Sequence, residues 1–221
     1  MTTMTSSSIE FETPTGYKDE ITARSDGIRW LRIPSRRYLV IDGTEAPGTP
    51  DFKDAIGTLY PVAYTLHFAL RGRGVDAPVG ALQGLYWLGG ETLASVEGGQ
   101  AASEVSGGWR WRLMLPIPEA ATSAEIEAAI RDVRAKKQPP RMDELWVFTW
   151  EEGLVAQIIH IGAYGDEPRT IARLQESVAE AGRTARGVHH EIYISDPNRA
   201  RPDRMKTLLR MDVADDHVRP A

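Results

Sequence analysis

The sequence predicts an α+β fold in which two tandem strand-helix-strand-strand units are related by a pseudo-two-fold axis. The first unit has a strand at 37–42, a helix at 51–71, and strands at 85–88 and 109–115. The same order returns with a strand at 154–161, a helix at 167–181, and strands at 188–194 and 206–212. A repeated unit that cannot bury its own apolar face packs against its copy. We therefore expect antiparallel sheets with helices on one face and a groove between the halves, where ligand sites are common.

The helix at 51–71 begins at Thr49-Pro50-Asp51 and carries a single apolar stripe. The stripe recurs at intervals of three and four residues and consists of Phe52, Ala55, Ile56, Leu59, Ala63, Leu66 and Leu70. Pro61 lies within the helix, where the missing N–H predicts a kink. Tyr60 and Tyr64 lie one turn apart beside the stripe, so both are candidates for a wall of the groove.

The segments between the repeated elements have simpler interpretations. Residues 90–108 are rich in Gly, Ser, Ala and Glu and predict a loop between two strands. A helix at 123–137, which Ser123 can cap, is expected between the two units. Strands at 145–150 and 154–161 are expected to form a hairpin across Glu151-Glu152-Gly153.

Glu191 is the most unusual residue of the chain because it lies in the middle of a predicted strand. The side-chain period of two places His189, Glu191 and Tyr193 on one face of that strand. Strand interiors are depleted in glutamate, and a buried carboxylate is costly unless it is paired or hydrogen-bonded. The face is either a solvated outer surface or the lining of a cavity.

Composition limits the classes of protein that the chain can form. The 221 residues are 42% hydrophobic with a net charge of -5, which is typical of a globular protein with one or two domains. The absence of cysteine excludes disulfides, a thiol nucleophile and a Cys-based zinc site. No apolar run approaches the ~18 residues of a membrane span, and residues 1–8 do not resemble a secretory signal, so we expect a cytoplasmic protein.

The charge pattern argues against nucleic acid as a partner, because the overall balance is acidic. One local cluster of residues is nevertheless basic. It contains Arg199, Arg201, Arg204, Lys206 and Arg210. We interpret it as a solvated loop and strand face.

Four segments of the chain carry a resemblance to a known family. They are Tyr38-Leu39-Val40-Ile41-Asp42-Gly43, Leu59-Tyr60-Pro61-Val62-Ala63-Tyr64, 157–164 with Gly162-Ala163-Tyr164, and 189–197 with His189-His190-Glu191-Ile192-Tyr193. The chain resembles the GyrI-like small-molecule-binding superfamily, whose members have two such strand-helix-strand-strand (SHS2) modules. Gly162-Ala163-Tyr164 resembles the family's Gly-Pro-Tyr with alanine in place of proline. The second and fourth segments resemble the stand-alone branch that includes cyclopropanoid hydrolases.

The resemblance divides the chain into a central domain and two flanking segments. It covers residues 28–213, with modules at about 37–116 and 154–213. A polar arm at 1–27 and a tail at 214–221 remain outside it. The multidrug-sensing members of the superfamily also carry a DNA-binding helix pair, which we do not expect here because only about 27 polar residues precede the region of resemblance.

The resemblance implies a pocket with Glu191 on its floor. In the drug-sensing members a glutamate on the equivalent strand lies in an aromatic pocket and binds cationic drugs. We expect ligand contacts from Trp87, Trp111, Tyr193 and His189. No cofactor is expected, and no metal, because His189 and His190 point to opposite faces of the strand.

The chemistry expected of this pocket is attack of water on a cyclopropane fused to a dienone. Aromatic surroundings raise the pKa of a carboxyl group, so Glu191 suits a general base. Tyr60, Tyr64 or Tyr193 suits the donor to the oxygen that gains charge. Glu191 could instead attack the ring itself.

Three functions stay open on the sequence. The first is a detoxifying hydrolase of electrophilic aromatic compounds, and the second is a multidrug-binding protein that sequesters flat or cationic ligands without turnover. The third is a gyrase-interacting protein. The physiological substrate, the proton donor and the oligomeric state also stay open.

Overall fold

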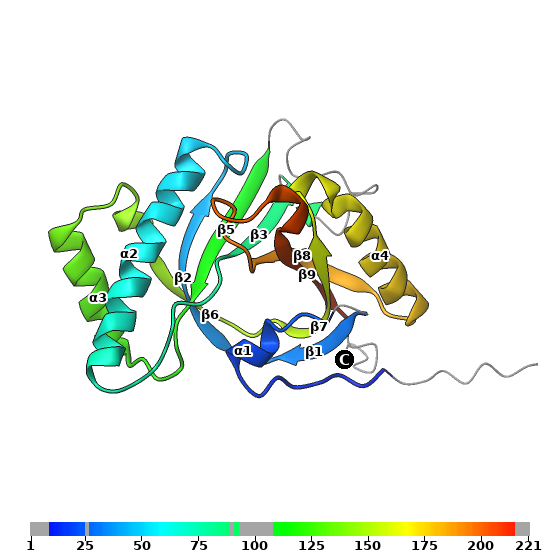
Figure 1. The fold of residues 1–221 in the computed structure, drawn as a ribbon, viewed down its shortest axis with the longest axis horizontal. Coiled ribbons are helices and arrows are strands. Elements are labelled where there is room, and N and C mark those ends of the chain that lie inside the picture. The colour runs from blue at the N-terminus through cyan, green and yellow to red at the C-terminus, as the bar shows by residue number, and fades with distance from the viewer. Residues whose placement is uncertain (1–8, 25–26, 89–90, 93–107, 215–221) are drawn as a thin grey trace, which may run out of the picture.

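The computed structural model describes residues 9–24, 27–88, 91–92 and 108–214 of the chain (Figure 1). The helices are α1 (Tyr17–Glu20), α2 (Pro50–Gly72), α3 (Ser123–Lys136) and α4 (Glu167–Glu180), and the 3₁₀ turns are η3 (Met142–Glu144), η4 (Tyr164–Asp166) and η5 (Pro202–Arg204). The strands are β1 (Arg29–Ile33), β2 (Arg36–Gly43), β3 (Gln83–Leu88), β4 (Glu91–Thr92), β5 (Trp109–Pro116), β6 (Trp146–Trp150), β7 (Gly153–Ile161), β8 (Ala185–Tyr193) and β9 (Lys206–Val213). Most of the loop expected at 90–108 lies outside the described residues.

The described strands form one antiparallel sheet with the order β1-β7-β9-β8-β3-β5-β2-β6, and β4 pairs with β3. Strands β2, β5 and β3 of the first unit are neighbours, and β7, β9 and β8 of the second unit repeat their order in mirror image across the β3–β8 contact. Helix α2 follows β2 in the chain as α4 follows β7. The α+β class and the antiparallel sheet are thus confirmed, and the mirrored order is what a pseudo-two-fold relation requires.

The expected hairpin between β6 and β7 is wrong. Strand β6 pairs with β2 at one end of the sheet, whereas β7 pairs with β1 and β9 near the other end. Two residues separate β6 from β7, so the sheet must curl until its two ends lie close together (Figure 1). Glu152 in that connection is buried, with its carboxylate bonded to Arg210 and His190. A tight turn would leave this carboxylate in solvent.

Strand side chains alternate between two faces of the curled sheet. On the outer face, Ile41 and Leu113 join a large apolar cluster with α2 and α3, and Leu209 joins a second cluster with α4. On the inner face, Val40 and Met114 belong to a third cluster. The three long helices therefore cover one face of the sheet, as Figure 1 shows.

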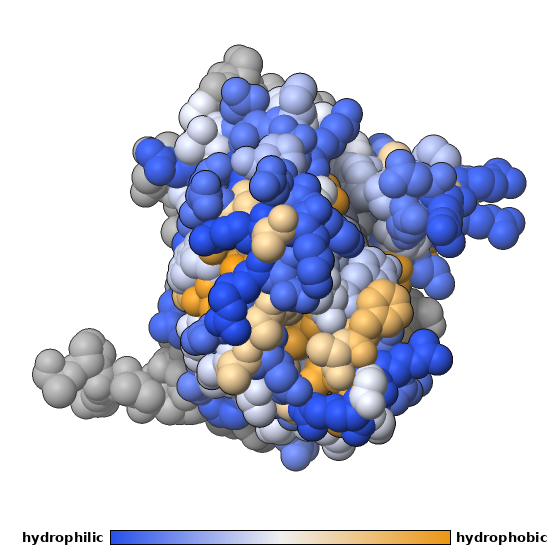
Figure 2. Space-filling model, turned by 90° about the vertical axis from the view of Figure 1, so that its left-hand side faces the viewer, coloured by the Kyte–Doolittle hydropathy of each residue, from blue (hydrophilic) through white to orange (hydrophobic). Residues whose placement is uncertain are grey.

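Helix α3 packs on α2 and presents its other side to solvent. Its N-terminus is a capping box, in which Thr122 Oγ1 accepts from the Glu125 N–H at 3.3 Å and Glu125 Oε2 accepts from the Thr122 N–H at 2.8 Å. The cap is therefore Thr122 rather than Ser123, because the box needs a carboxylate three residues on. Figure 2 shows this side of the molecule as mostly hydrophilic, with apolar side chains visible below.

Helix α2 runs without interruption through Pro61 and carries much of the first core. Its buried side chains include most of the stripe that the sequence predicts, such as Leu59, Leu66 and Leu70. Thr49 caps its first turn by accepting from the Phe52 N–H. Among the described residues, no helix combines the length and apolar character that a membrane crossing requires.

The segment expected to be an irregular arm contains α1, and the last residue of α1 is fully buried. Glu20 bonds to Arg36 Nε at 2.5 Å and lies 3.1 Å from Arg210. Arg210 is also buried, contrary to the solvated face expected for the basic cluster. Its guanidinium lies 2.8 Å from Glu152 and donates to Gln157 at 2.6 Å. Buried charges persist when they are paired and hydrogen-bonded, and the partners here come from α1 and from the β6–β7 connection.

Candidate functional site

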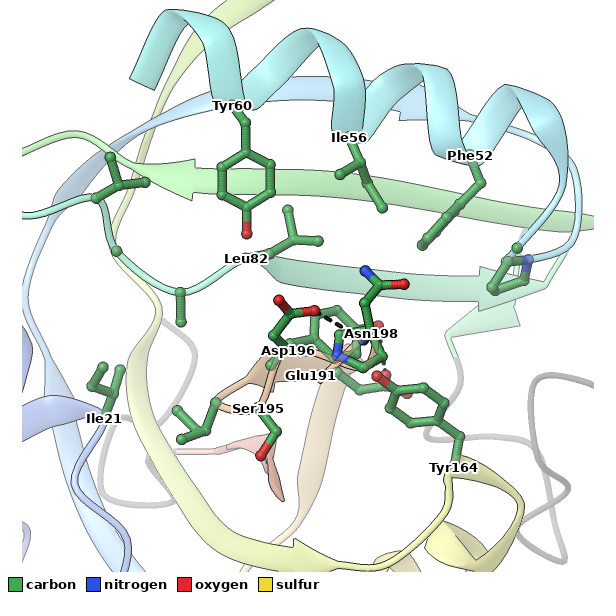
Figure 3. A pocket seen from close by; sticks show the side chains of 18 of the residues that line it. Ile21, Phe52, Ile56, Tyr60, Leu82, Tyr164, Glu191, Ser195, Asp196 and Asn198 are labelled. Carbon is green, nitrogen blue, oxygen red and sulfur yellow. Dashed lines mark hydrogen bonds between the residues drawn. The ribbon is translucent and has the colours of Figure 1, made fainter. Parts of the chain in front are cut away.

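A cavity of about 930 Å³ opens on the outer face of the sheet, over the contact between β3 and β8 (Figure 3). Helix α2 forms one wall, and η4 with the start of α4 forms the opposite wall. The side chains that define its chemistry are Phe52, Ile56, Tyr60, Tyr64, Leu82, Tyr86, Tyr164, Glu167, Glu191, Tyr193 and Asp196. The groove expected between the two halves is therefore present.

Glu191 lies on the floor of this cavity and is only 6% exposed. Its Oε1 lies 3.0 Å from His189 Nε2, and its Oε2 accepts from the Tyr193 hydroxyl at 2.7 Å. The three side chains share one face of β8, as the period of two predicts. Both carboxylate oxygens are thus held by neighbours on the same strand, which fixes the orientation of the group.

Tyr86 extends this hydrogen-bonded chain across the strand contact. Its hydroxyl bonds to the Tyr193 hydroxyl. Because Tyr193 gives its own proton to Glu191, Tyr86 is the donor in this bond. Gly84, which pairs with Glu191, makes the arrangement possible: a Cβ there would lie 2.6 Å from the Tyr86 ring. The chain links β3 of the first unit to β8 of the second at the centre of the sheet.

Glu167, in the first turn of α4, is a second buried carboxyl group in the cavity. Burial, together with the negative charge of Glu191, raises the pKa of Glu167 to about 9. Burial also acts to raise the pKa of Glu191, but hydrogen bonds from His189, Tyr193 and Glu167 outweigh it and lower that pKa. The elevated pKa that the sequence led us to expect therefore belongs to Glu167 and not to Glu191.

Tyr60 and Tyr164 face the cavity from opposite walls. The Tyr60 hydroxyl points from α2 into the cavity, and the Tyr164 hydroxyl points toward Glu191 (Figure 3). Burial raises the pKa of Tyr164 to about 12 and also raises the pKa of Tyr60. Both phenols therefore keep their proton at neutral pH and can donate a hydrogen bond to a ligand. Tyr64 stacks on Tyr60 with ring centroids 6.1 Å apart but is 48% exposed, which places it at the rim.

The structure brings four of the predicted site residues to the cavity, namely Glu191, Tyr193, Tyr60 and Tyr64. His189 does not line the cavity but bonds to Glu191 from the side. Trp111 lies beneath α2, fully buried, where its ring packs on Phe52 at 5.1 Å and its Nε1 donates to the Glu45 carbonyl at 2.7 Å. It therefore belongs to the core rather than to the ligand surface.

Trp87 also lies outside the cavity. Adjacent strand residues point to opposite faces, so Tyr86 faces the cavity and Trp87 packs on the inner face with Leu85, Phe148 and Trp150. We predict that Trp87→Ala leaves the affinity for a flat aromatic dye unchanged, whereas Tyr60→Ala weakens it by about tenfold or more, the scale of one lost aromatic contact. Fluorescence titration measures both, and equal losses in the two variants would contradict this placement.

Several residues of the cavity, Tyr86 among them, were not anticipated from the sequence. Glu167 follows Asp166 and precedes Pro168 at a helix start, where an acidic residue has an ordinary explanation in the helix dipole. Tyr164 is part of Gly162-Ala163-Tyr164, so the motif was visible although the role of the phenol was not. Asp196 lies in a turn after β8, where aspartate is common.

The charge of the cavity is one-sided. Three carboxyl groups line it, those of Glu167, Glu191 and Asp196, and none of the described residues that line it is a lysine or an arginine. Aromatic faces attract cations and flat rings. The lining thus suits neutral or cationic aromatic ligands and disfavours anions.

Glu167, His189 and Glu191 each offer one atom within 4.8 Å of the others, which is close enough to hold a metal ion. Glu167 comes from α4, a helix from which the adjacent His189 and His190 gave no reason to expect a metal ligand. His189 bonds to one oxygen of Glu191 and Tyr193 to the other. The carboxyl groups of Glu167 and Glu191 are also hydrogen-bonded to each other. A proton between the two carboxyl groups accounts for the same contacts as a cation.

Comparisons with known proteins agree with this architecture. The family model described as GyrI-like small molecule binding domain matches residues 120–213. An uncharacterized conserved protein from Listeria innocua has a TM-score of 0.77 at 26% identity, covering 89% of this chain and 96% of that one. A hydrolase from Listeria innocua has a TM-score of 0.75 at 27% identity with the same coverage. A search of curated protein sequences finds no match.

A more distant structure shares the fold alone. The EcmrR C-terminal domain has a TM-score of 0.51 at 9% identity, covering 85% of this chain and 97% of that one. The family match and the open aromatic cavity both fit a small-molecule-binding domain. Residues 120–213 thus match the GyrI-like small molecule binding domain, and the chain as a whole is similar in fold to the Listeria innocua proteins.

Proposed function

We propose that the protein binds flat, aromatic or electrophilic small molecules in the cavity and hydrolyses cyclopropanoid compounds, a detoxifying activity. The observation that carries this proposal is Glu191, a carboxylate held by two neighbours on the floor of an aromatic cavity. A similar structure from Listeria innocua is described as a hydrolase, which supports the reaction class.

The proposed reaction begins with a water molecule between Glu191 and the ligand. Glu191 accepts a proton from that water as its oxygen attacks a carbon of the cyclopropane. The ring C–C bond breaks, and its electrons move into the dienone, which becomes a phenolate. Glu191 returns its proton to solvent, and the phenolate oxygen takes a proton from solvent to give the phenol. Tyr60 and Tyr164 are the donors placed to hydrogen-bond that oxygen, because their hydroxyls point into the cavity. Tyr193 is a weaker candidate because its proton is committed to Glu191.

Sequestration without turnover is the second candidate function. The acidic, aromatic lining favours it, since such a surface binds cationic drugs without any chemistry. A gyrase-interacting protein is the third, and it predicts an effect on DNA supercoiling at equimolar protein without a ligand. Neither sequestration nor gyrase interaction requires that His189 and Tyr193 hold the two oxygens of Glu191 in one orientation.

Incubation with a spirocyclopropyl dienone in ¹⁸O-labelled water separates these functions. We expect mass spectrometry to find a product heavier by one labelled water, formed faster than in buffer alone. Recovery of unchanged dienone from a protein that binds it would replace the hydrolase by the sequestering function. Failure to bind the dienone or a flat cationic dye would remove both.

A further inference from the structure

Two carboxyl groups face the same cavity from different elements, and the mechanism above uses only one of them. Glu191 comes from β8 and Glu167 from the first turn of α4. The two residues are 6% and 5% exposed, and one carboxyl oxygen of each lies within 4.8 Å of the other. Glu167 Oε1 is buried and has no hydrogen-bond partner among the described residues, although Thr207 bonds to the Glu167 side chain. Such a pair is stable only if one member carries a proton.

The proton belongs on Glu167. Glu191 accepts from Tyr193 and is bonded to His189, whereas the hydrogen bonds that act on the pKa of Glu167 are those with Thr207 and Glu191. The site therefore holds a carboxylic acid beside a carboxylate at neutral pH, and burial keeps the pKa of the acid at about 9. A base and an acid with separated pKa values are the pair needed to open a strained ring by water addition.

We propose that Glu167 is the catalytic acid partner of the Glu191 base and that the pair hydrolyses aryl epoxides to vicinal diols. This inference rests on the cavity and on the base of the proposed function. Aryl epoxides would be a second class of substrate beside the cyclopropanoid compounds, and their leaving group is an alkoxide oxygen. An alkoxide is a much stronger base than a phenolate, so its departure needs a proton from an acid.

The steps balance without any further reagent. Glu191 takes a proton from water while the water oxygen forms a bond to an epoxide carbon. The C–O bond of the ring breaks, and the departing oxygen takes the proton of Glu167. The proton now on Glu191 passes to Glu167 through their hydrogen bond, which restores the starting state. The net reaction adds one water to the epoxide.

The walls of the cavity suit this substrate. Phe52, Tyr60 and Tyr164 offer apolar ring surface to an aryl group, and no described lysine or arginine in the lining competes for the epoxide oxygen. An aryl epoxide is neutral and flat at its rings, as the lining requires. The about 930 Å³ of the cavity is within the range of sites for drug-sized ligands.

The test uses the full chain with trans-stilbene oxide in ¹⁸O-labelled water. We expect the diol with one labelled oxygen, and we expect Glu167→Gln to lose at least about 100-fold of this rate, the lower scale for a positioned acid. Glu176→Gln, an exposed glutamate on the same helix, is the matched control and should keep the parental rate. The parental rate should fall as the pH rises through about 9, because Glu167 then loses its proton.

Each other outcome decides the inference. If the parent hydrolyses the cyclopropyl dienone but leaves stilbene oxide unchanged, the acid role is overturned and the proposed function stands. If neither compound binds, the proposed function fails as well. A folded Glu167→Gln variant with the parental epoxide rate overturns the proposal. Loss of the parental rate on addition of EDTA also overturns it, because Glu167, His189 and Glu191 would then be ligands of a metal ion. If Glu167→Gln does not fold, the pH dependence of the parental epoxide rate is the test. A rate that does not fall as the pH rises through about 9 overturns the role of Glu167 as the acid.

Discussion

Replacing Glu191 with glutamine is expected to slow cyclopropanoid hydrolysis by at least about 100-fold while the ligand still binds. Glutamine keeps the shape and volume of the side chain, so the walls of the cavity stay in place. It cannot accept a proton from water, and its N–H₂ group cannot accept the bond that Tyr193 donates. A single-turnover assay gives the rate, and quenching of the protein's aromatic fluorescence gives the affinity.

The pH dependence of this reaction follows from the lowered pKa of Glu191. The base is already ionised throughout the neutral range, because its hydrogen bonds stabilise the charged form. The parental rate should therefore be flat across neutral pH and fall only under acidic conditions, below the ordinary range of a glutamate. A rate that instead rises through neutral pH would indicate the elevated pKa that aromatic surroundings alone would produce. Tyr64→Phe, at the exposed rim, is a matched control that should keep most of the activity.

The position of Glu191 could be predicted from the sequence because a carboxylate is out of place in a strand interior. Its neighbours His189 and Tyr193 followed from the side-chain period of two, and the structure bonds both to it. Tyr60 followed from helical spacing in the same way. Each of these inferences uses only the local period of one element, which is the most strongly encoded feature of a chain.

The tryptophans could not be placed by the same reasoning. Alternation along β3 does not say whether Tyr86 or Trp87 faces the helices, because that choice depends on the register with β8. Trp111 shares the face of Tyr86, but α2 lies over it, and the path of a helix across a sheet is a tertiary property. The pKa of Glu191 also depended on Glu167, a partner that lies 24 residues earlier in the chain.

Replacing Arg210 with methionine is expected to lower the free energy of unfolding by about 3–5 kcal/mol, the usual cost of removing one partner of a buried ion pair. The guanidinium bonds to Glu152 at 2.8 Å and lies 3.1 Å from Glu20, and all three side chains are buried. Methionine fills a similar volume but leaves two buried carboxylates with one cationic partner fewer. Because Glu20 belongs to α1 and Glu152 to the β6–β7 connection, the loss should also loosen the closure of the curled sheet.

Urea denaturation at several pH values tests this prediction. Burial acts to raise the pKa of Glu152, but His190 and Arg210 outweigh it and hold that pKa down to about 2. A lowered pKa contributes stability that is present above the ordinary value of 4.5 and is lost as the pH falls toward 2. The difference between parent and Arg210→Met should therefore be largest at neutral pH and shrink in acid. Arg201→Met, which removes an exposed pair with Asp203, should cost less than about 1 kcal/mol at any pH. Equal costs for the two variants would show that Arg210 contributes no more than a surface charge, and that other contacts hold α1 and the β6–β7 connection against the sheet.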